Sequence, residues 1–407
     1  MLIYDSIHGY IKLNQLASSI VDTPIFQRLR NIHQTGVLYL VFPTANHNRF
    51  EHSIGTYYLA RKMIEKIATK QPELNITAEI IDLVSIAGLC HDLGHMLFSH
   101  LFDDLFLPSL ANYEEIKQSK NIVHENRSIF LLNYMVEKYN INLNKDQIKV
   151  IGDLINTKTA EYSKWKSQYQ IGKWIFQIIS NPKNSIDVDK FDYLVRDTRA
   201  VGLKLGFDYN RIIEDAKVID NNICYSLQCS EDIYHMFFIR YRLHRQIYNH
   251  KTVKAIEILI IELLNEFEKE YKISEYILDP EKMIELVDFF IWQPKNQKIK
   301  ELINDIQQRK LPKLVYQDIS INKSEIVLPF DPSTFKIIEF KVGYINGPSN
   351  PLNNINFYNL NNGKLVSKNK VSDFSLLINQ KYQEHFLRVY CTDLSLVEKF
   401  KEYFLTI

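Results

Sequence analysis

Residues 77–100, TAEIIDLVSIAGLCHDLGHMLFSH, run from a strongly apolar stretch directly into one aspartate and three of the chain's 12 histidines. Thr77 is a suitable N-cap, and the apolar spacing that follows it predicts a buried helix over residues 77–95. The apolar residues at helical spacing are Ile80, Ile81, Val84 and Leu89. Burying unpaired ionisable groups is costly, so the fold must bring polar partners or a metal ion to this segment.

The ionisable residues of this stretch carry donor atoms that suit a metal ion. On a helix, His91 and His95 would differ by about 40° around the axis, with Asp92 offset from His91 by about 100°. Imidazole nitrogen and carboxylate oxygen suit Fe, Mn, Zn or Mg. One segment cannot complete such a site, so another histidine and another carboxylate must come from elsewhere. The alternative is that these histidines are core residues bonded to backbone groups.

Two other segments supply candidate partners. HNRFEHS places His52 beside Arg49 and Glu51, in a segment whose apolar spacing predicts a helix over residues 47–72. In SIDVDKFDYLVRD, Asp189 lies among apolar neighbours, where a carboxylate has to be paired or to ligate a metal. The acidic residues of this last segment are Asp187, Asp189, Asp192 and Asp197.

Helical patterns dominate the first two thirds of the chain, and β-branched runs separated by turn residues follow. Thr23 and Pro24 form a typical helix start, and Gly36 a typical stop. The sequence therefore predicts a mainly α fold, with a helical domain over residues 1–300 and a small α+β lobe over residues 301–407. Helices are expected at 23–36, 47–72, 77–95, 230–271 (one long helix or a bent pair) and 396–407, and β-branched runs lie at 324–332, 335–351 and 354–367.

Composition excludes several classes of protein. The net charge of +1 argues against a globally basic nucleic-acid binder. No stretch approaches the roughly 20 apolar residues of a membrane span, and the N-terminus has no signal-peptide pattern. The 4 cysteines form no CxxC pair, which favours a reducing compartment. We expect an intracellular protein, cytoplasmic or nuclear, that does not bind membranes.

The segments HNRFEHS, CHDLGHMLFSH and IDVDKFDYLVRD, in this order, resemble those of the HD-domain phosphohydrolases. With DTPIFQRLRNIHQTG and RYRLHRQIYNHK, the chain is most similar to the deoxynucleoside-triphosphate (dNTP) triphosphohydrolases, including vertebrate members with a sterile-alpha-motif domain. The resemblance implies an HD-domain helical bundle and a divalent metal (Mg, Mn, Fe or Zn). It also implies hydrolysis of a dNTP to a deoxynucleoside and inorganic triphosphate.

The resemblance also assigns the metal and catalytic residues. His124 would protonate the leaving 5′-oxygen, a role that suits a group titrating near neutrality, and Asp103 would orient it. His95 and His100 would lie near the phosphates and the leaving group. The implied metal ligands are His52, His91, Asp92 and Asp189.

A further set of residues would bind the substrate. Lys190, Arg240 and Arg49 would hold the triphosphate through their positive charges. Asp197 and Gln34 would bind the 3′-hydroxyl. Tyr248 would stack on the sugar and block a 2′-hydroxyl. The alternatives are core packing for Tyr248 and a salt bridge to Glu51 or another acid for Arg49. The implied substrate contacts are Gln34, Arg49, Lys190, Tyr193, Asp197, Arg240, Tyr248 and Asn249.

The vertebrate member of this family is activated by nucleotides bound between subunits, and part of that pattern is present in this sequence. Ser226 and Gln228 replace an expected basic pair, which predicts weaker binding of a second activator. Thr35 and Asn249 replace a leucine and a glutamine near the sugar, so base or sugar preference is expected to differ. The candidate contacts for a guanine-nucleotide activator are Asp22, Gln27 and Arg30, and those for the second activator are Arg211 and Lys368. A homo-oligomer, dimer or tetramer, is expected.

Two other functions remain open from the residues alone. One is an HD phosphohydrolase acting on a nucleoside monophosphate or a cyclic nucleotide. The other is a nucleotide- or nucleic-acid-binding module with a structural metal. Lys190, Arg240 and Tyr248 favour a triphosphate substrate, and the low net charge argues against nucleic acid.

Overall fold

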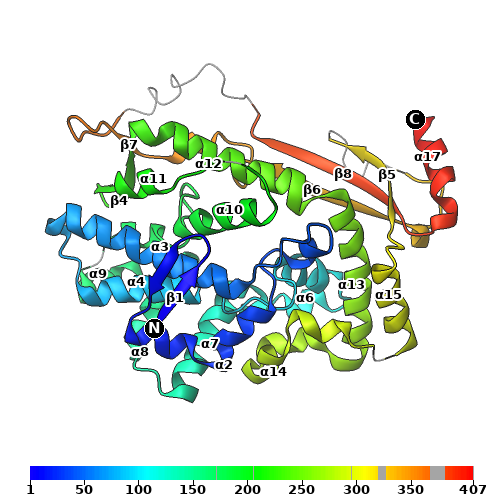
Figure 1. Ribbon diagram of the computed structural model, residues 1–407, viewed down its shortest axis with the longest axis horizontal. Coiled ribbons are helices and arrows are strands. Elements are labelled where there is room, and N and C mark those ends of the chain that lie inside the picture. The colour runs from blue at the N-terminus through cyan, green and yellow to red at the C-terminus, as the bar shows by residue number, and fades with distance from the viewer. Residues whose placement is uncertain (171, 205, 295, 320–326, 367–380, 407) are drawn as a thin grey trace.

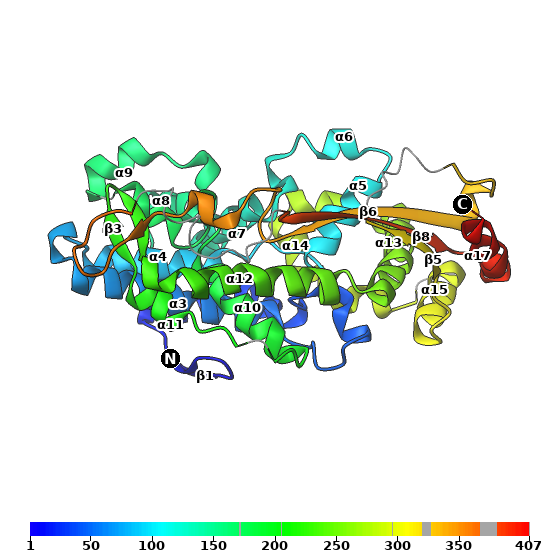
Figure 2. The same cartoon turned by 90° about the horizontal axis from the view of Figure 1, so that it is seen from above.

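The computed structural model describes residues 1–406, apart from residues 171, 205, 295, 320–326 and 367–380. Helices form the body of the molecule, and the long strands β6 (Phe335–Gly343) and β8 (Gln383–Cys391) lie at one end of it (Figures 1 and 2). This arrangement confirms the predicted mainly α fold with a small β-containing part. Among the described helices, none combines the length and apolar content that crossing a membrane requires.

Helices α3 (Arg49–Lys70) and α4 (Ala78–Cys90) pack against each other at the centre. α10 (Val188–Ala200) packs on α3, and α8 (Lys145–Ile155) packs on α4 and α7 (His124–Tyr139). α3, α4 and α10 each begin one residue after a side chain that accepts a hydrogen bond from a backbone N–H of the first turn. Those capping residues are Asn48, Thr77 and Asp187.

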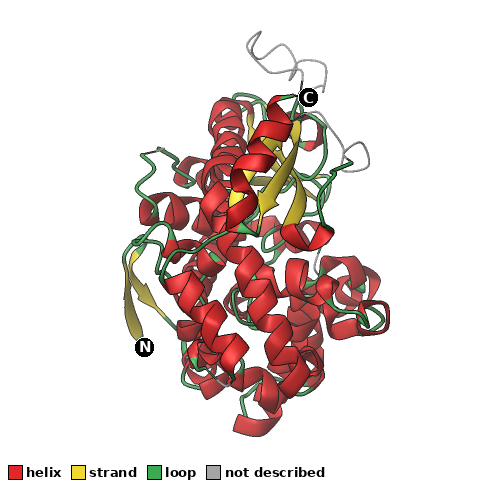
Figure 3. Ribbon diagram, turned by 90° about the vertical axis from the view of Figure 1, so that its right-hand side faces the viewer, coloured by secondary structure: helices red, strands yellow, loops and turns green. Residues whose placement is uncertain are grey.

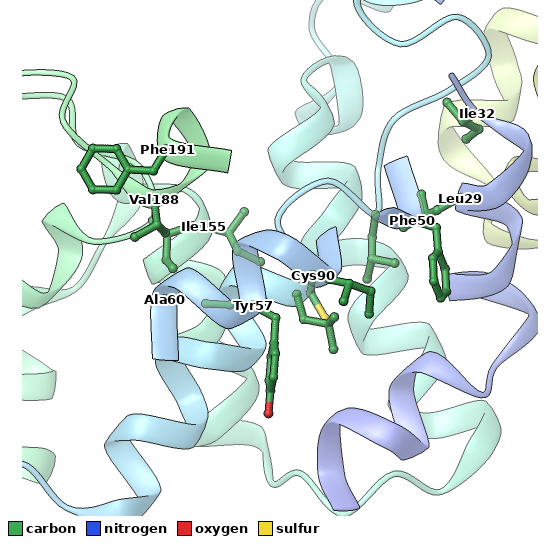
Figure 4. Close-up of a cluster of buried hydrophobic side chains, with 14 of the residues drawn as sticks. Leu29, Ile32, Phe50, Tyr57, Ala60, Cys90, Ile155, Val188 and Phe191 are labelled. Carbon is green, nitrogen blue, oxygen red and sulfur yellow. The ribbon is translucent and has the colours of Figure 1, made fainter. Parts of the chain in front are cut away.

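One continuous buried cluster joins these helices. Phe50 and Tyr57 of α3 and Cys90 of α4 lie in it together with Leu29 and Phe191 (Figure 4). Each of these five side chains is 3% exposed or less. The cluster continues beyond Cys90 through Leu93 and Met96, so the polar residues of this segment lie among core residues.

Shorter helices surround the centre. They are α1 (Gln15–Val21), α2 (Pro24–Gln27), α5 (Leu107–Ser109), α6 (Tyr113–Ile116), α9 (Tyr162–Tyr169), α11 (Asn210–Glu214), α14 (Pro280–Glu285), α15 (Gln297–Gln307) and α17 (Val397–Leu405). The predicted boundary near residue 300 falls within α15 and stays a prediction.

The described strands form three small sheets. β5 (Lys313–Asp318), β8 and β6 make an antiparallel sheet in that order, covered at one end by α17 (Figure 3). The other strands are β1 (Leu2–Asp5) and β2 (Gly9–Lys12), which form a hairpin, β3 (Lys217–Ile219) and β4 (Asn222–Ser226), which form a second hairpin, and β7 (Phe357–Tyr358). β7 pairs in parallel with β4, so a late segment of the chain returns to the helical body.

The predicted helical stretch at 230–271 is a bent pair. The carbonyl groups of the break find partners on β8: Arg388 Nη1 donates to Asn249 O at 2.5 Å, and the Tyr390 hydroxyl donates to Lys251 O at 3.0 Å. The pair consists of α12 (Ser230–Arg242), a widened turn (Leu243–Tyr248) and α13 (Lys251–Tyr271).

The helix predicted over residues 23–36 is shorter than expected. Thr23 does cap a helix, but α2 ends at Gln27 and the chain continues as a tight 3₁₀ turn before Ile32 becomes extended. Ile32 O accepts from Arg49 N at 2.9 Å, and this pairing with the start of α3 takes the place of further helical bonds.

Of the predicted strand region 354–367, only β7 and a bridge between Tyr358 and Leu365 form; residue 367 lies outside the described residues.

The helix predicted over residues 77–95 ends at Cys90, so His91 and His95 do not share a helical face. The carbonyl groups beyond it bind arginines from other elements. Arg28 Nη2 donates to Leu93 O at 2.6 Å and to His95 O at 2.9 Å. These tertiary contacts replace the helical hydrogen bonds that the sequence pattern led us to expect.

Candidate functional site

Three helices bring a cluster of potential metal ligands together. His52 lies in the first turn of α3, His91 directly follows α4, and Asp189 lies in the first turn of α10. One ligand atom from each of these residues lies within 4.8 Å of the other two. Segments more than 130 residues apart in sequence thus meet at one point, as the sequence pattern suggested.

His52 is fully buried between two carboxylates. Its Nδ1 donates to Asp192 Oδ2 at 2.8 Å, and its Nε2 lies 3.0 Å from Asp189 Oδ1. Burial opposes a charge on the ring, but these two hydrogen bonds raise the pKa of His52 from 6.5 to about 10. Nε2 therefore holds a proton that a cation at this point would displace.

His91 presents a free nitrogen to the same point. Its Nδ1 donates to Gly88 O at 2.8 Å, which leaves the lone pair of the neutral ring on Nε2. Nε2 is buried, lies 3.5 Å from Asp189 Oδ1, and has no hydrogen-bond partner among the described residues. A backbone-oriented histidine with an orphaned Nε2 is the arrangement that metal ligation requires, so the residues fit a divalent ion.

Asp92 adds a second carboxylate. It is 3% exposed, and its Oδ2 lies 3.4 Å from His52 Nε2. Burial disfavours its charge, but the guanidinium of Arg49 pairs with Oδ2 and holds the pKa of Asp92 well below its usual range. Arg49 therefore forms a salt bridge to an acidic residue, which the sequence had left open as the alternative to a contact with the substrate phosphates.

Three further histidines lie beside the cluster. The rings of His95 and His124 stack, with centroids 4.0 Å apart, and His100 packs edge-on against both. Both ring nitrogens of His95 are buried and without a hydrogen bond among the described residues. Burial and the nearby charge of Arg49 lower the pKa of His95, which keeps this ring neutral.

His124 and Asp103 are neighbours, but Asp103 has a stronger partner. Its carboxylate accepts from Arg127 Nη2 at 2.6 and 2.7 Å, whereas His124 Nδ1 lies 3.6 Å away. Burial opposes a charge on His124, but Asp103 and Glu125 raise its pKa above the ordinary value. His124 is therefore able to carry a proton near neutral pH.

Arg127 is a buried residue that the sequence analysis missed. Its Nε donates to Gly94 O at 2.7 Å, so it ties α7 to the segment that follows His91. Gly94 permits this approach, because a Cβ there would lie 2.2 Å from His124 O and 2.4 Å from Ser128 N. A signal was present in the sequence, since Arg127 lies one helical turn after His124.

The cluster opens into a cavity of about 680 Å³, a size typical of small-molecule sites. Lys190, Tyr193 and Arg240 line it. Lys190 Nζ lies 3.0 Å from Asp187 Oδ2, and Arg240 donates to Gly343 O and to Asn346 Oδ1. Two cations thus face the cavity while their other contacts hold them in place.

The remaining predicted substrate residues line another wall. Tyr248 donates to Asp197 Oδ2 at 2.5 Å, and Asp197 Oδ1 lies 2.7 Å from His47 Nε2, a partner the sequence analysis missed. Asn249 donates to His244 O, and Gln34 Oε1 is buried without a hydrogen bond among the described residues. All but His47 line the cavity.

Asp192 connects the cluster to the N-terminal hairpin and was not singled out from the sequence. Besides His52, it binds His8 Nε2 at 2.7 Å and Arg196 at 2.8 and 2.9 Å. A Cβ at Gly55 would lie 1.9 Å from Asp192 Oδ1, so only glycine lets α10 approach α3 so closely. The position of Asp192, one helical turn after Asp189, was the sequence feature that could have indicated its place beside the cluster.

Of the candidate activator residues that the structure describes, Asp22, Arg30 and Arg211 are exposed and Gln27 is half-buried. Asp22 follows α1, and Arg30 donates to Gln27 Oε1 at 2.7 Å, with its guanidinium over the Phe50 ring. Arg211 is half exposed and pairs with an acidic residue of α12 at 3.2 Å. Lys368 lies outside the described residues.

Known proteins are similar in sequence to this chain over nearly its whole length. The HD domain family profile matches residues 49–195. The Dictyostelium discoideum protein named deoxynucleoside triphosphate triphosphohydrolase SAMHD1 homolog is 34% identical, covering 96% of this chain and 77% of that protein. The Homo sapiens deoxynucleoside triphosphate triphosphohydrolase SAMHD1 is also 34% identical, covering 96% and 70%. Putative HD domain-containing protein L394 of Acanthamoeba polyphaga mimivirus is 33% identical, covering 97% and 92%.

Proposed function

The chain belongs to the family of SAMHD1-like deoxynucleoside triphosphate triphosphohydrolases, and we propose that it hydrolyses dNTPs to a deoxynucleoside and inorganic triphosphate. Water would attack the α-phosphate. The observation that carries this proposal is the orphaned Nε2 of His91, which faces Asp189 at the end of a cavity lined by Lys190 and Arg240. A metal-ligand cluster beside two fixed cations is suited to a polyphosphate substrate.

We propose His52, His91, Asp92 and Asp189 as the residues that hold a divalent ion, whether Mg, Mn, Fe or Zn. When bound, such an ion polarises a phosphoryl oxygen and lowers the pKa of bound water. The imidazole and carboxylate donors of this set are compatible with each of these metals. Arg49 would then share the Asp92 carboxylate, or turn toward the phosphates as the family resemblance implies.

The proton chemistry falls to the three histidines. His124, with its raised pKa, is the proposed donor to the leaving 5′-oxygen. Asp103 orients it from 3.6 Å, and Arg127 holds Asp103. His95 is kept neutral and has no hydrogen bond on either ring nitrogen among the described residues, although its Nε2 lies 3.3 Å from Asp92 Oδ1. It is suited to donate a hydrogen bond to a phosphate oxygen, and His100 flanks it.

The sugar is proposed to lie against Asp197, Gln34 and Tyr248. Tyr248 is already fixed by its hydrogen bond to Asp197, so its ring presents a rigid wall that would exclude a 2′-hydroxyl. Tyr193 and Asn249 complete this part of the cavity. The unpartnered Oε1 of Gln34 supports a contact with a hydroxyl donor such as the 3′-OH.

A guanine nucleotide is the proposed first activator, held by Asp22, Gln27 and Arg30 in a homo-oligomer, and Arg211 and Lys368 are proposed for a second activator site. The placement of Arg30 over an aromatic ring, next to Gln27, supports a surface that can bind a base. Light scattering of the purified protein with and without GTP tests this: a mass that stays that of one chain in both would contradict it.

One experiment tests the central proposal. The purified protein is incubated with each dNTP and Mg²⁺, Mn²⁺ or Fe²⁺, and deoxynucleoside and triphosphate are measured, with and without GTP. We expect triphosphate release that Asp92→Ala abolishes and that Asp279→Ala, a helix cap on α14 outside the cavity lining, leaves unchanged. No triphosphate from any dNTP would refute the proposed activity, and release unaffected by Asp92→Ala would refute the metal assignment.

A further inference from the structure

The segment that links His95 to His100 has an unfavourable backbone conformation. Phe98 and Ser99 are consecutive, neither is glycine, and both lie in the left-handed region with φ of 55° and 59°. L-residues rarely adopt this region, and two in succession require contacts that hold them there. Both residues are buried, so the surrounding protein must provide those contacts.

The carboxylate of Asp288 is the principal contact. Its Oδ1 accepts from Phe98 N–H at 2.6 Å, and its Oδ2 accepts from the backbone N–H of His33 at 2.8 Å and from His33 Nδ1 at 2.6 Å. Asp288 is 3% exposed and lies about 190 residues beyond the segment that it holds. One buried side chain thus satisfies donors from two separate parts of the chain.

Both of these parts line the cavity. His33 precedes Gln34, and Phe98 lies between His95 and His100. The two parts are also joined to each other, because Ser99 Oγ donates to His33 O at 2.8 Å and accepts from Arg49 Nε at 3.0 Å. Through Arg49 the connection reaches Asp92.

A buried cation, Arg28, binds backbone carbonyls at the start of the same segment. Arg28 is 4% exposed and binds the carbonyls of Leu93 and His95, while its Nε and Nη1 have no partner among the described residues. Burial and the charge of Arg127 lower the pKa of Arg28 to about 9, and the charge of Asp288 opposes this only in part. The segment is therefore held at its start by a cation and at its turn by an anion.

We propose that Asp288 is a positioning residue, which holds the His95–His100 segment and the His33–Gln34 segment in the arrangement that the reaction needs. The inference rests on the proposed function, because it assigns Asp288 a role in that same site. Asp288 touches neither the cavity nor the ligand cluster, so it acts only through the segments that it holds.

Asp288→Asn is the sharpest test, because it keeps the shape of the side chain. An amide oxygen can still accept from Phe98 N–H, but the amide nitrogen then faces the two donors of His33. We expect kcat for dNTP hydrolysis to fall by about tenfold or more with KM changed less than about threefold, since small displacements of reacting groups lower the rate strongly. Bound metal should be unchanged.

Hydrogen exchange gives a readout that does not depend on activity. Peptides covering residues 96–101 should exchange faster in Asp288→Asn, while peptides of α12 keep their protection. The matched control is Asp279→Asn, in which a half-buried carboxylate that caps α14 is changed in the same way. If Asp288→Asn does not fold, His33→Ala removes the Nδ1 contact, and with it the stacking of the His33 ring on Tyr39, but keeps the backbone N–H contact; it should show the same changes more weakly.

The outcomes are separable. If the wild type releases triphosphate and Asp288→Asn has unchanged kcat or unchanged exchange at 96–101, the positioning role is wrong. If exchange rises throughout the protein, or bound metal falls with kcat, Asp288 has only a general structural role and the inference is again overturned. If the wild type is inactive on every dNTP, the proposed function fails, and unchanged exchange at 96–101 alone overturns the role of Asp288.

Discussion

Replacing Asp192 by asparagine removes one negative charge from the fully buried contact between α10 and His52. The carboxylate fixes His52 through Nδ1 at 2.8 Å and also binds His8 and Arg196. Ligand histidines depend on such partners for their orientation, and losing the partner weakens metal binding by about 10–100-fold. We therefore expect Asp192→Asn to reduce metal affinity by that factor, or about 1.4–2.7 kcal/mol.

The same change should also destabilise the protein. Breaking a buried ion pair from one side costs about 3–5 kcal/mol, because the remaining charge stays buried. Arg196 keeps a second acidic partner, Asp5, at 2.9 Å, which places the loss at the low end. The free energy of unfolding of the metal-free protein is expected to fall by about 3 kcal/mol.

Calorimetric titration of the metal-free protein with Mn²⁺, together with urea unfolding, measures both quantities. Asp153→Asn is the matched control, since Asp153 is also a buried helical carboxylate, bound to Trp165 Nε1 at 2.7 Å and paired with Lys149. It should destabilise the fold and leave metal affinity unchanged. Unaltered Mn²⁺ affinity in a folded Asp192→Asn protein would refute the reasoning.

Three other perturbations follow from the same geometry. The pKa of His52 is raised from 6.5 to about 10, so its protonation stabilises the metal-free fold fully below pH 6.5, and this contribution is lost toward pH 10. Metal binding should therefore release a proton and tighten with pH across that window; calorimetry showing pH-independent affinity would contradict this. Gly94→Ala should cost about 1–3 kcal/mol in urea unfolding, because its Cβ collides with the backbone of α7, and kcat should fall as His124 moves; unchanged stability would speak against this contact. Arg127→Met should cost about 3 kcal/mol, because it leaves the Asp103 carboxylate with only His124, 3.6 Å away, as a partner, and an unaltered unfolding midpoint would count against it.

The elements that could be predicted from sequence are those whose start depends on local chemistry. Asn48, Thr77 and Thr23 each cap a helix close to the expected position, because the capping hydrogen bond involves residues one turn apart. The end of α4 could not be foreseen. It depends on Arg28 and Arg127, which take the carbonyls of residues 93–95 from elsewhere in the chain.

The candidate site shows the same division. The apolar surroundings of His91 and Asp189 indicated that these residues need partners, and the resemblance to the HD-domain phosphohydrolases implied that His52 joins them. The structure brings ligand atoms of all three within 4.8 Å of one another. Asp288 could not have been found in this way. It lies in an ordinary stretch, LVDFFIW, and its importance arises only from the fold that places it against Phe98.

The hydrogen bonds from β8 to the break before α13 have a consequence for the order in which the protein is made. The cluster of His52, His91 and Asp189 is complete once residue 189 and its supporting helices have been synthesised. The wall that contains Tyr248 and Asn249 is secured by Arg388 and Tyr390, which emerge from the ribosome about 200 residues after Asp189. A nascent chain can therefore assemble its cation ligands well before it has a finished substrate pocket.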